Sequence, residues 1–204
     1  RDAQESRGLG DVYKRQYIKG TFELKETSYY NEQGLLDGDF EQLYLFGQPR
    51  TTGHYKNGQK DGTWVQIAES GDTLHITTYR DGNEEGLQVR FDRETGSRLK
   101  EYYKMNNRYD GLYREYDPST GELVYEATYE FGRLNGRARS LVRDNRFDYW
   151  ETSTYVNGRQ TGPFESRYVK NDKVRETGTY RNGHRTGRWK RYDINGKLEM
   201  EWEE

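Results

Sequence analysis

Short stretches of apolar and aromatic residues alternate along the chain with turns that contain glycine. Clear examples are Leu74–Tyr79, Leu87–Phe91, Leu123–Tyr129 and Arg188–Tyr192. Their β-branched and aromatic residues favour strands, and Asn-Gly and Asp-Gly pairs at many of the turns favour hairpins, because positive φ costs little there. Glycine recurs too often to allow a helix of ordinary length. The pattern therefore predicts an all-β chain in which one strand and its turn take about twelve residues.

The turns follow a repeat in which a tyrosine precedes a first glycine by three residues and a second glycine by seven. Seven tyrosines, which we call the anchors, lie 24 to 26 residues apart: Tyr30, Tyr55, Tyr79, Tyr103, Tyr129, Tyr155 and Tyr180. The second glycines are Gly38, Gly62, Gly86, Gly111, Gly136, Gly162 and Gly187. A repeat of this length is typical of one supersecondary unit stacked on the next. We predict seven hairpins over residues 17–204, with the anchors packing over neighbouring glycine turns and setting the spacing. The alternative is a ladder of tyrosines that binds a ligand.

Two copies are irregular. Tyr30 reaches its two glycines one residue late, and Asn107 stands where the first glycine is expected after Tyr103. Asparagine tolerates the left-handed conformation better than other residues with a side chain, so this substitution supports the alignment.

An aromatic residue follows the second glycine by two positions in five copies, and we call this position +2. The five residues are Phe40, Trp64, Tyr113, Phe164 and Trp189, whereas the fifth copy has Ala138. Apolar residues recur at +5, for example Ile67 and Phe91. Positions +2 and +5 face opposite sides of a regular strand, so either a bulge intervenes or both faces carry aromatic residues. We favour the second reading, which predicts an elongated, open, antiparallel single-layer sheet of tandem hairpins.

Four of the +2 aromatics, Trp64, Tyr113, Phe164 and Trp189, are candidates for contact with a partner, since an exposed aromatic stripe is a common binding surface. The alternative is that they pack within the sheet. Aromatic pairs across strands contribute about 0.2–1 kcal/mol each, which would offset a small core.

The unit Tyr-x-[Asn/Asp]-Gly-x3-Gly-x-aromatic, seen best in Tyr55–Trp64 and Tyr180–Trp189, resembles the MORN repeat in its bacterial variant. The resemblance covers about residues 20–204, and copies one, four and five depart from the motif. It implies an elongated, twisted, open sheet of successive hairpins that acts as a binding or assembly scaffold. Eukaryotic proteins of this type are linked to membrane lipids and protein assembly, and many bacterial ones are labelled as the antitoxin component of a toxin–antitoxin system.

Residues 1–16, RDAQESRGLGDVYKRQ, share nothing with the repeat. They resemble a translated sequencing-adapter stretch of the kind found in open reading frames from metagenomic assemblies. We predict that this segment is not native and set it apart from the array of residues 17–204. The alternative is a genuine disordered tail.

Composition and charge exclude several classes of protein. Hydrophobic residues make up only 30% of the chain, but aromatics reach 15%, which is too many for a typical disordered segment. With 33 Lys and Arg against 35 Asp and Glu, the chain lacks the basic footprint of a nucleic-acid-binding protein. It has no cysteine and no apolar run of about 18 residues, so the sequence predicts neither disulfides nor a transmembrane helix.

Nothing in the sequence favours catalysis, a cofactor or a metal. His54, His75 and His184 lie in different copies and match no known metal or nucleophile motif. We therefore expect a non-enzymatic scaffold that binds another protein along the sheet, with toxin neutralisation as the specific function that the resemblance implies. The alternative is a structural protein of the cell envelope that binds glycan or lipid. The location stays open between cytoplasm and cell envelope.

Overall fold

The computed structural model describes residues 3–7, 12–17 and 24–204, and the chain divides into two units, Arg1–Arg108 and Tyr109–Glu204. Every helix or strand assigned within the described residues is a β-strand. The first unit contains β1 (Ala3–Arg7), β2 (Val12–Tyr17), β3 (Leu24–Tyr30), β4 (Leu36–Leu43), β5 (Pro49–Lys56), β6 (Gln59–Ile67), β7 (Thr73–Arg80), β8 (Asn83–Phe91) and β9 (Arg98–Met105). The second contains β10 (Arg108–Tyr116), β11 (Leu123–Glu130), β12 (Arg133–Val142), β13 (Tyr149–Val156), β14 (Arg159–Tyr168), β15 (Val174–Arg181), β16 (His184–Tyr192) and β17 (Leu198–Glu203). The first residue of β10, Arg108, is counted with the first unit.

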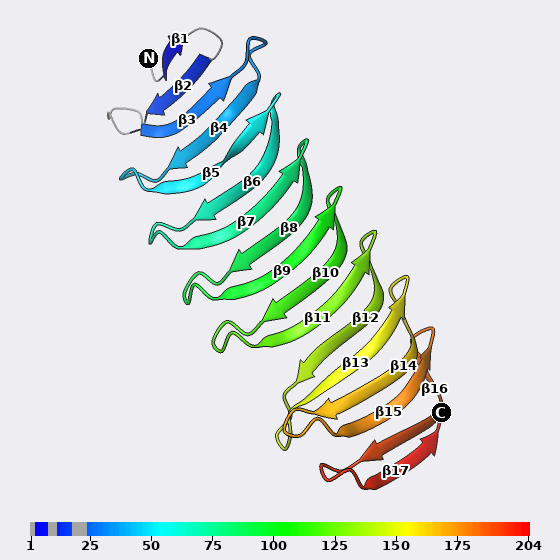
Figure 1. Ribbon diagram of the computed structural model, residues 1–204. Coiled ribbons are helices and arrows are strands. Elements are labelled where there is room, and N and C mark those ends of the chain that lie inside the picture. The colour runs from blue at the N-terminus through cyan, green and yellow to red at the C-terminus, as the bar shows by residue number, and fades with distance from the viewer. Residues whose placement is uncertain (1–2, 8–11, 18–23) are drawn as a thin grey trace. The chain divides into compact units, whose positions relative to one another are not determined.

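Within each unit every strand pairs antiparallel with the next one along the chain. Figure 1 shows this order as successive arrows of alternating direction. In the described part of each unit, no helix or second sheet covers the strands. The predicted fold class, an open antiparallel single-layer meander of tandem hairpins, is therefore confirmed.

Strands also form within the segment that the sequence set apart. Ala3 to Arg7 pairs with Val12 to Gln16, and β2 pairs in turn with β3. Residues 1–2 and 8–11 lie outside the described residues. Strand pairing does not test where a segment comes from, so the non-native origin of residues 1–16 remains a prediction.

Each anchor hairpin after the first closes with a tight turn in which both central residues have positive φ. In the turn after β5, Asn57 has φ of 47° and Gly58 has φ of 81°. Such a turn matches the right-handed twist of paired strands, which explains the predicted Asn-Gly and Asp-Gly signals. The Gly58 amide also donates a 2.7 Å hydrogen bond to the Leu36 carbonyl of the preceding hairpin. Equivalent bonds from Gly132, Gly158 and Gly183 recur in the second unit, so the turns themselves link one repeat to the next.

The second glycine lies at a bulge in six repeats, those of β4, β6, β8, β12, β14 and β16. In the β5–β6 hairpin His54 pairs with Asp61, but Thr52 pairs with Val65, so β6 advances four residues while β5 advances two. Gly62 lies in this extra stretch with φ of 69°, a conformation that disfavours a side chain. Because the excess is even, the side chains before and after the bulge keep their faces.

A second bulge lies just before most +5 positions. Such a bulge is one of the two explanations of the odd offset between +2 and +5. Gln66 pairs with His75 and Ile67 with Thr73, which places the extra residue on β7 and leaves β6 regular. Residues at +2 and +5 of β6 therefore stay on opposite faces, as the single-layer reading requires.

Many of the buried side chains belong to one row of buried and half-buried residues that crosses the strands of each unit, on the face that carries the anchors. We call this face the anchor face and the row the central row. In the first unit the row comprises Ser28, Phe40, Gly53, Trp64, Thr77, Gln88 and Tyr102. In the second it comprises Tyr113, Ala127, Ala138, Ser153, Phe164, Gly178, Trp189 and Trp202. Along most of each row a small residue on an odd-numbered strand alternates with a larger one on an even-numbered strand, and the exceptions are Tyr102, Ala138 and Trp202.

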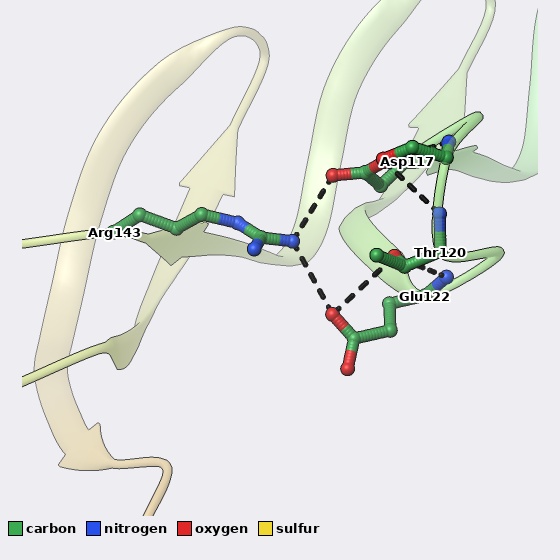
Figure 2. A network of polar contacts seen from close by, with 5 residues as sticks. Asp117, Thr120, Glu122 and Arg143 are labelled. Atoms are coloured by element: carbon green, nitrogen blue, oxygen red, sulfur yellow. Dashed lines mark hydrogen bonds and ion pairs between the residues drawn. The ribbon is translucent and has the colours of Figure 1, made fainter.

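The turn between β10 and β11 is held by a side chain of the next repeat. Figure 2 shows Arg143, which follows β12, between Asp117 and Glu122 of the turn after β10. Its guanidinium lies 3.1 Å from Asp117 Oδ2 and 3.2 Å from Glu122 Oε2. Hydrogen bonds from Ser119 hold the pKa of Asp117 below its ordinary value. The turn thus keeps a charged acceptor for the arginine of the following hairpin.

Candidate functional site

The structure gives the anchors a specific position. Tyr55 pairs across the ladder with Gly38, Tyr79 with Gly62, and the same pairing recurs for Tyr129, Tyr155 and Tyr180 with Gly111, Gly136 and Gly162. Each of these five anchors thus lies directly opposite the second glycine of the preceding repeat, which fits the constant spacing of their copies.

The fourth repeat differs from the alignment. Gly86 pairs with Lys104, while Tyr103 pairs with Leu87 and has 44% of its surface exposed. The Asn106-Asn107 turn, with positive φ at both residues, follows Lys104 at the distance that Asn57-Gly58 follows Tyr55. Lys104 therefore holds the anchor position in this repeat. Tyr103, the anchor predicted from the sequence, lies one residue earlier and faces the opposite side of the sheet.

The four candidates for partner contact are buried. Exposure is 4% for Trp64, 9% for Tyr113, 5% for Phe164 and 0% for Trp189. Trp189 lies between Phe164 and Trp202, with ring centroids 5.3 and 6.1 Å away, and Tyr180 meets its edge at 5.2 Å. These rings stabilise the central row and offer little surface to a partner, so the packing alternative describes their position.

Sequence reasoning missed two glycines that the row requires. Gly53 and Gly178 lie in strands without positive φ, so the turn motif does not include them. A Cβ at either position would lie well inside 3.0 Å of Trp64 or Trp189. The available signal was a glycine two residues before an anchor, paired with a tryptophan at +2.

Two +2 positions lack an aromatic residue, and they behave differently. Gln88 is buried in its row, and its amide donates to the carbonyls of Thr78 and Gly86 at 3.1 and 3.3 Å. Ala138 is too short to reach across its neighbour. Three small residues, Ala127, Ala138 and Ser153, therefore follow one another between Tyr113 and Phe164.

A pocket of about 280 Å³ lies over this interruption. Its lining includes Ala138, Ser153 and Phe164. Three tyrosines line it: Tyr125, Tyr155 and Tyr180. Burial raises the pKa values of Tyr125 and Tyr155, so these hydroxyls stay protonated near neutral pH. The pocket thus combines ring surfaces with hydroxyl groups.

Glu151 supplies a carboxyl group to the same pocket. It lies between Ser140 and Ser166 in the ladder, on the anchor face. Burial raises its pKa above the ordinary value of 4.5, although Arg175 and Arg185 act in the opposite direction. Gln160, which also lines the pocket, donates a 2.7 Å hydrogen bond to the Ser153 hydroxyl. Glu151 is the carboxyl group available there to accept a hydrogen bond from a guest.

A second pocket of about 530 Å³ is connected to this one through arginines that share a buried carboxylate. Glu176 is 2% exposed and pairs with Arg185 at 3.1 Å, with Arg191 at 2.8 Å and with Arg175 at 3.7 Å. Arg185 lines the first pocket, and Arg175 and Arg191 line the second. The arginines are further fixed by rings, since Arg185 lies 4.1 Å from the Trp189 centroid and Arg175 lies 3.9 Å from that of Tyr149.

The histidines make separate local contacts. His54 Nδ1 lies 3.1 Å from Asp39 Oδ1, and His75 contacts Gln66 at 2.8 Å and Arg90 at 3.2 Å. His184 begins β16 in the other unit. Among the described residues, no group of three or more His, Asp or Glu side chains has the arrangement of a metal site.

Comparison with known proteins gives no family. No family model matches the chain, and no curated protein matches it. A solved structure with some similarity is titled "Crystal Structure of TcdB2-TccC3-Cdc42". The match has 13% identity and a TM-score of 0.23, and covers 93% of this chain. It spans only 13% of the length of that one. Within the described ranges, no helix has the length and hydropathy to cross a membrane.

Proposed function

We propose that this chain is a non-catalytic scaffold that binds another protein along its repeat sheet. The observation that carries the proposal is the anchor face of the second unit. Its two pockets are lined by side chains from successive hairpins, from β11 to β17. Repeat proteins characteristically build binding surfaces in this way, by juxtaposing equivalent positions of neighbouring repeats.

The lining side chains are fixed before any partner arrives. Glu176 holds three arginines, Gln160 holds Ser153, and Tyr180 packs against Phe164 with ring centroids 5.8 Å apart. Binding to such a surface loses little side-chain entropy, which favours recognition of a defined partner. Within the scaffold class, the resemblance to bacterial MORN-type repeats offers toxin neutralisation as the specific function, by analogy alone.

The test is affinity capture with the full chain from extracts of the native host, followed by reconstitution of the complex from purified components. Two charge reversals serve as a matched pair: Glu151→Arg on the anchor face and Glu165→Arg on the opposite face. Glu165 pairs in the ladder with Thr152 and Thr177, away from the pocket. We expect one stoichiometric partner, lost with Glu151→Arg and kept with Glu165→Arg.

Two results would count against the proposal. Retention of the chain by lipid vesicles or glycans, with no protein partner, would favour the envelope alternative. Turnover of a small molecule by the purified chain would show an enzyme instead. If a toxin is the partner, co-expression of the chain should also relieve the growth arrest that the toxin causes.

A further inference from the structure

We propose that the pocket over Ala138 binds an aromatic side chain of the partner, a tryptophan or a tyrosine, which completes the central row where the chain lacks its own ring. The inference rests on the proposed function for the source of the ring. The chemistry of the site comes from the repeat itself.

Other repeats of the chain show what this position holds when it is filled. Trp189 and Trp64 occupy +2 in their own copies, and each meets an anchor edge-on, Tyr180 at 5.2 Å and Tyr55 at 4.9 Å. Edge-to-face packing of this kind is favourable between aromatic rings. The anchor beside the gap is Tyr155, which lines the pocket. A guest ring over Ala138 would meet Tyr155 as Trp64 meets Tyr79, at the next anchor along the sheet.

The space is sufficient for such a ring. The pocket has about 280 Å³, and a cavity of about 150 Å³ holds benzene. At the other +2 position without an aromatic residue, the long side chain of Gln88 fills the equivalent place and is hydrogen-bonded there. Only the short side chain of Ala138 leaves the place open in the second unit.

The polar groups favour a ring that carries a hydrogen-bond donor. The Glu151 carboxyl lies at the pocket, and an indole N–H or a phenol O–H would donate to it. A cationic guest is disfavoured, since Arg185 lines the same pocket and Arg175 lies close enough to Glu151 to lower its pKa. Tryptophan and tyrosine are also the residues most enriched at the centres of protein interfaces.

The test measures binding of four amino-acid amides to the full chain by NMR titration: N-acetyl-tryptophanamide, -phenylalaninamide, -leucinamide and -argininamide. We expect millimolar binding of the tryptophan probe, about tenfold weaker binding of the phenylalanine probe because it lacks the donor, and none of the other two. Glu151→Gln should reduce the preference for tryptophan over phenylalanine. Equal or tighter binding of the leucine or arginine probe would overturn the assignment.

Ala138→Trp provides the decisive variant, because it supplies the missing ring from the chain itself. It should keep the circular dichroism spectrum and abolish binding of the tryptophan probe. Thr152→Trp, on the opposite face, is the matched control and should bind the probe as the wild type does. If Ala138→Trp does not fold, Ala138→Leu blocks the pocket with fewer atoms, and retained binding in either folded variant refutes the site.

The outcomes also separate this inference from the scaffold proposal. If a protein partner binds Ala138→Trp as tightly as the wild type, the scaffold proposal stands and the pocket is not part of the interface. If the tryptophan probe binds the pocket but no protein partner is found, the pocket assignment stands and the scaffold proposal fails.

Discussion

The Trp64 ring lies directly over Gly53, so close that a Cβ on the glycine would fall well inside 3.0 Å of it. Trp189 covers Gly178 in the same way. Gly53→Ala should therefore destabilise the protein by about 1–3 kcal/mol, the usual cost of overpacking a filled site. Chemical denaturation of the two proteins measures the difference.

The double-mutant cycle with Trp64→Ala provides the control for this prediction. Trp64→Ala alone should cost about 3–5 kcal/mol, as expected for a large buried aromatic side chain. In that background Gly53→Ala should cost almost nothing, because the ring that it would meet is gone. Additive effects would show that Gly53 is required for a reason other than the tryptophan.

The sequence was sufficient for the repeat and the hairpins because both depend on local backbone chemistry. A pair such as Asn57-Gly58 adopts positive φ at little cost, and a second glycine such as Gly62 does so at the bulge. The phase of an irregular copy was harder to predict. Tyr103 was the tyrosine nearest to the motif, although it precedes Gly111 by eight residues and not seven, and the Asn106-Asn107 turn puts Lys104 opposite Gly86. A one-residue shift exchanges the two faces of a strand, and only the register reveals it.

The pocket over Ala138 could not be predicted from the sequence, for a different reason. Ala138 was recognisable as an exception to the +2 pattern, yet Gln88 was an equal exception and fills its place in the row with its own side chain. What separates them is whether the side chain fills the row, and this depends on its length and on acceptors such as the Thr78 carbonyl. The burial of Trp64 and Trp189 likewise required the partner glycines to be known.

Phe131 occupies the first central position of its hairpin turn, where other copies have Asn or Asp. Its φ is 47° and 67% of its surface is exposed, so the residue gains little from packing in this strained conformation. Phe131→Asn should stabilise the protein by about 1 kcal/mol, because asparagine accepts the left-handed region more readily. Thermal and chemical denaturation both report the change. The converse variant, Asn157→Phe in the next hairpin, should destabilise by a similar amount, and equal stabilities in both pairs would contradict the turn argument.

Glu176 is the only carboxylate that the described structure places within 4.0 Å of Arg175, Arg185 and Arg191 together. Glu176→Gln leaves three neighbouring guanidinium groups without their shared negative charge. Breaking a buried ion pair from one side costs about 3 kcal/mol or more, so we expect a loss of that order in the free energy of unfolding.

The matched control for Glu176 is Glu165→Gln. Glu165 is a partly exposed carboxylate that pairs with Arg167 at 2.6 Å. Exposed pairs of this kind contribute at most about 1 kcal/mol. A loss for Glu176→Gln no larger than that for Glu165→Gln would show that the arginine cluster does not depend on the buried charge.

Glu151 should make the stability of the protein depend on pH in the direction opposite to an ordinary paired carboxylate. Burial raises the pKa of Glu151 in the folded protein above 4.5, so the folded state holds this proton more tightly than the unfolded chain does. The resulting stabilisation is fully present below about pH 4.5 and is lost as pH rises through the folded pKa. Glu151→Gln removes this dependence. The variant and the wild type should differ little in relative stability across the most acidic range, and the variant should gain on the wild type as pH rises to 7. The slope for one proton cannot exceed about 1.4 kcal/mol per pH unit, and solvent at the mouth of the pocket should keep it smaller.

The effect is measured by denaturation curves from pH 4 to 8 for the wild type, for Glu151→Gln and for the Glu165→Gln control. A constant difference between Glu151→Gln and the wild type over this range would show that Glu151 is solvated as in the unfolded chain, and would weaken its role as the acceptor in the pocket.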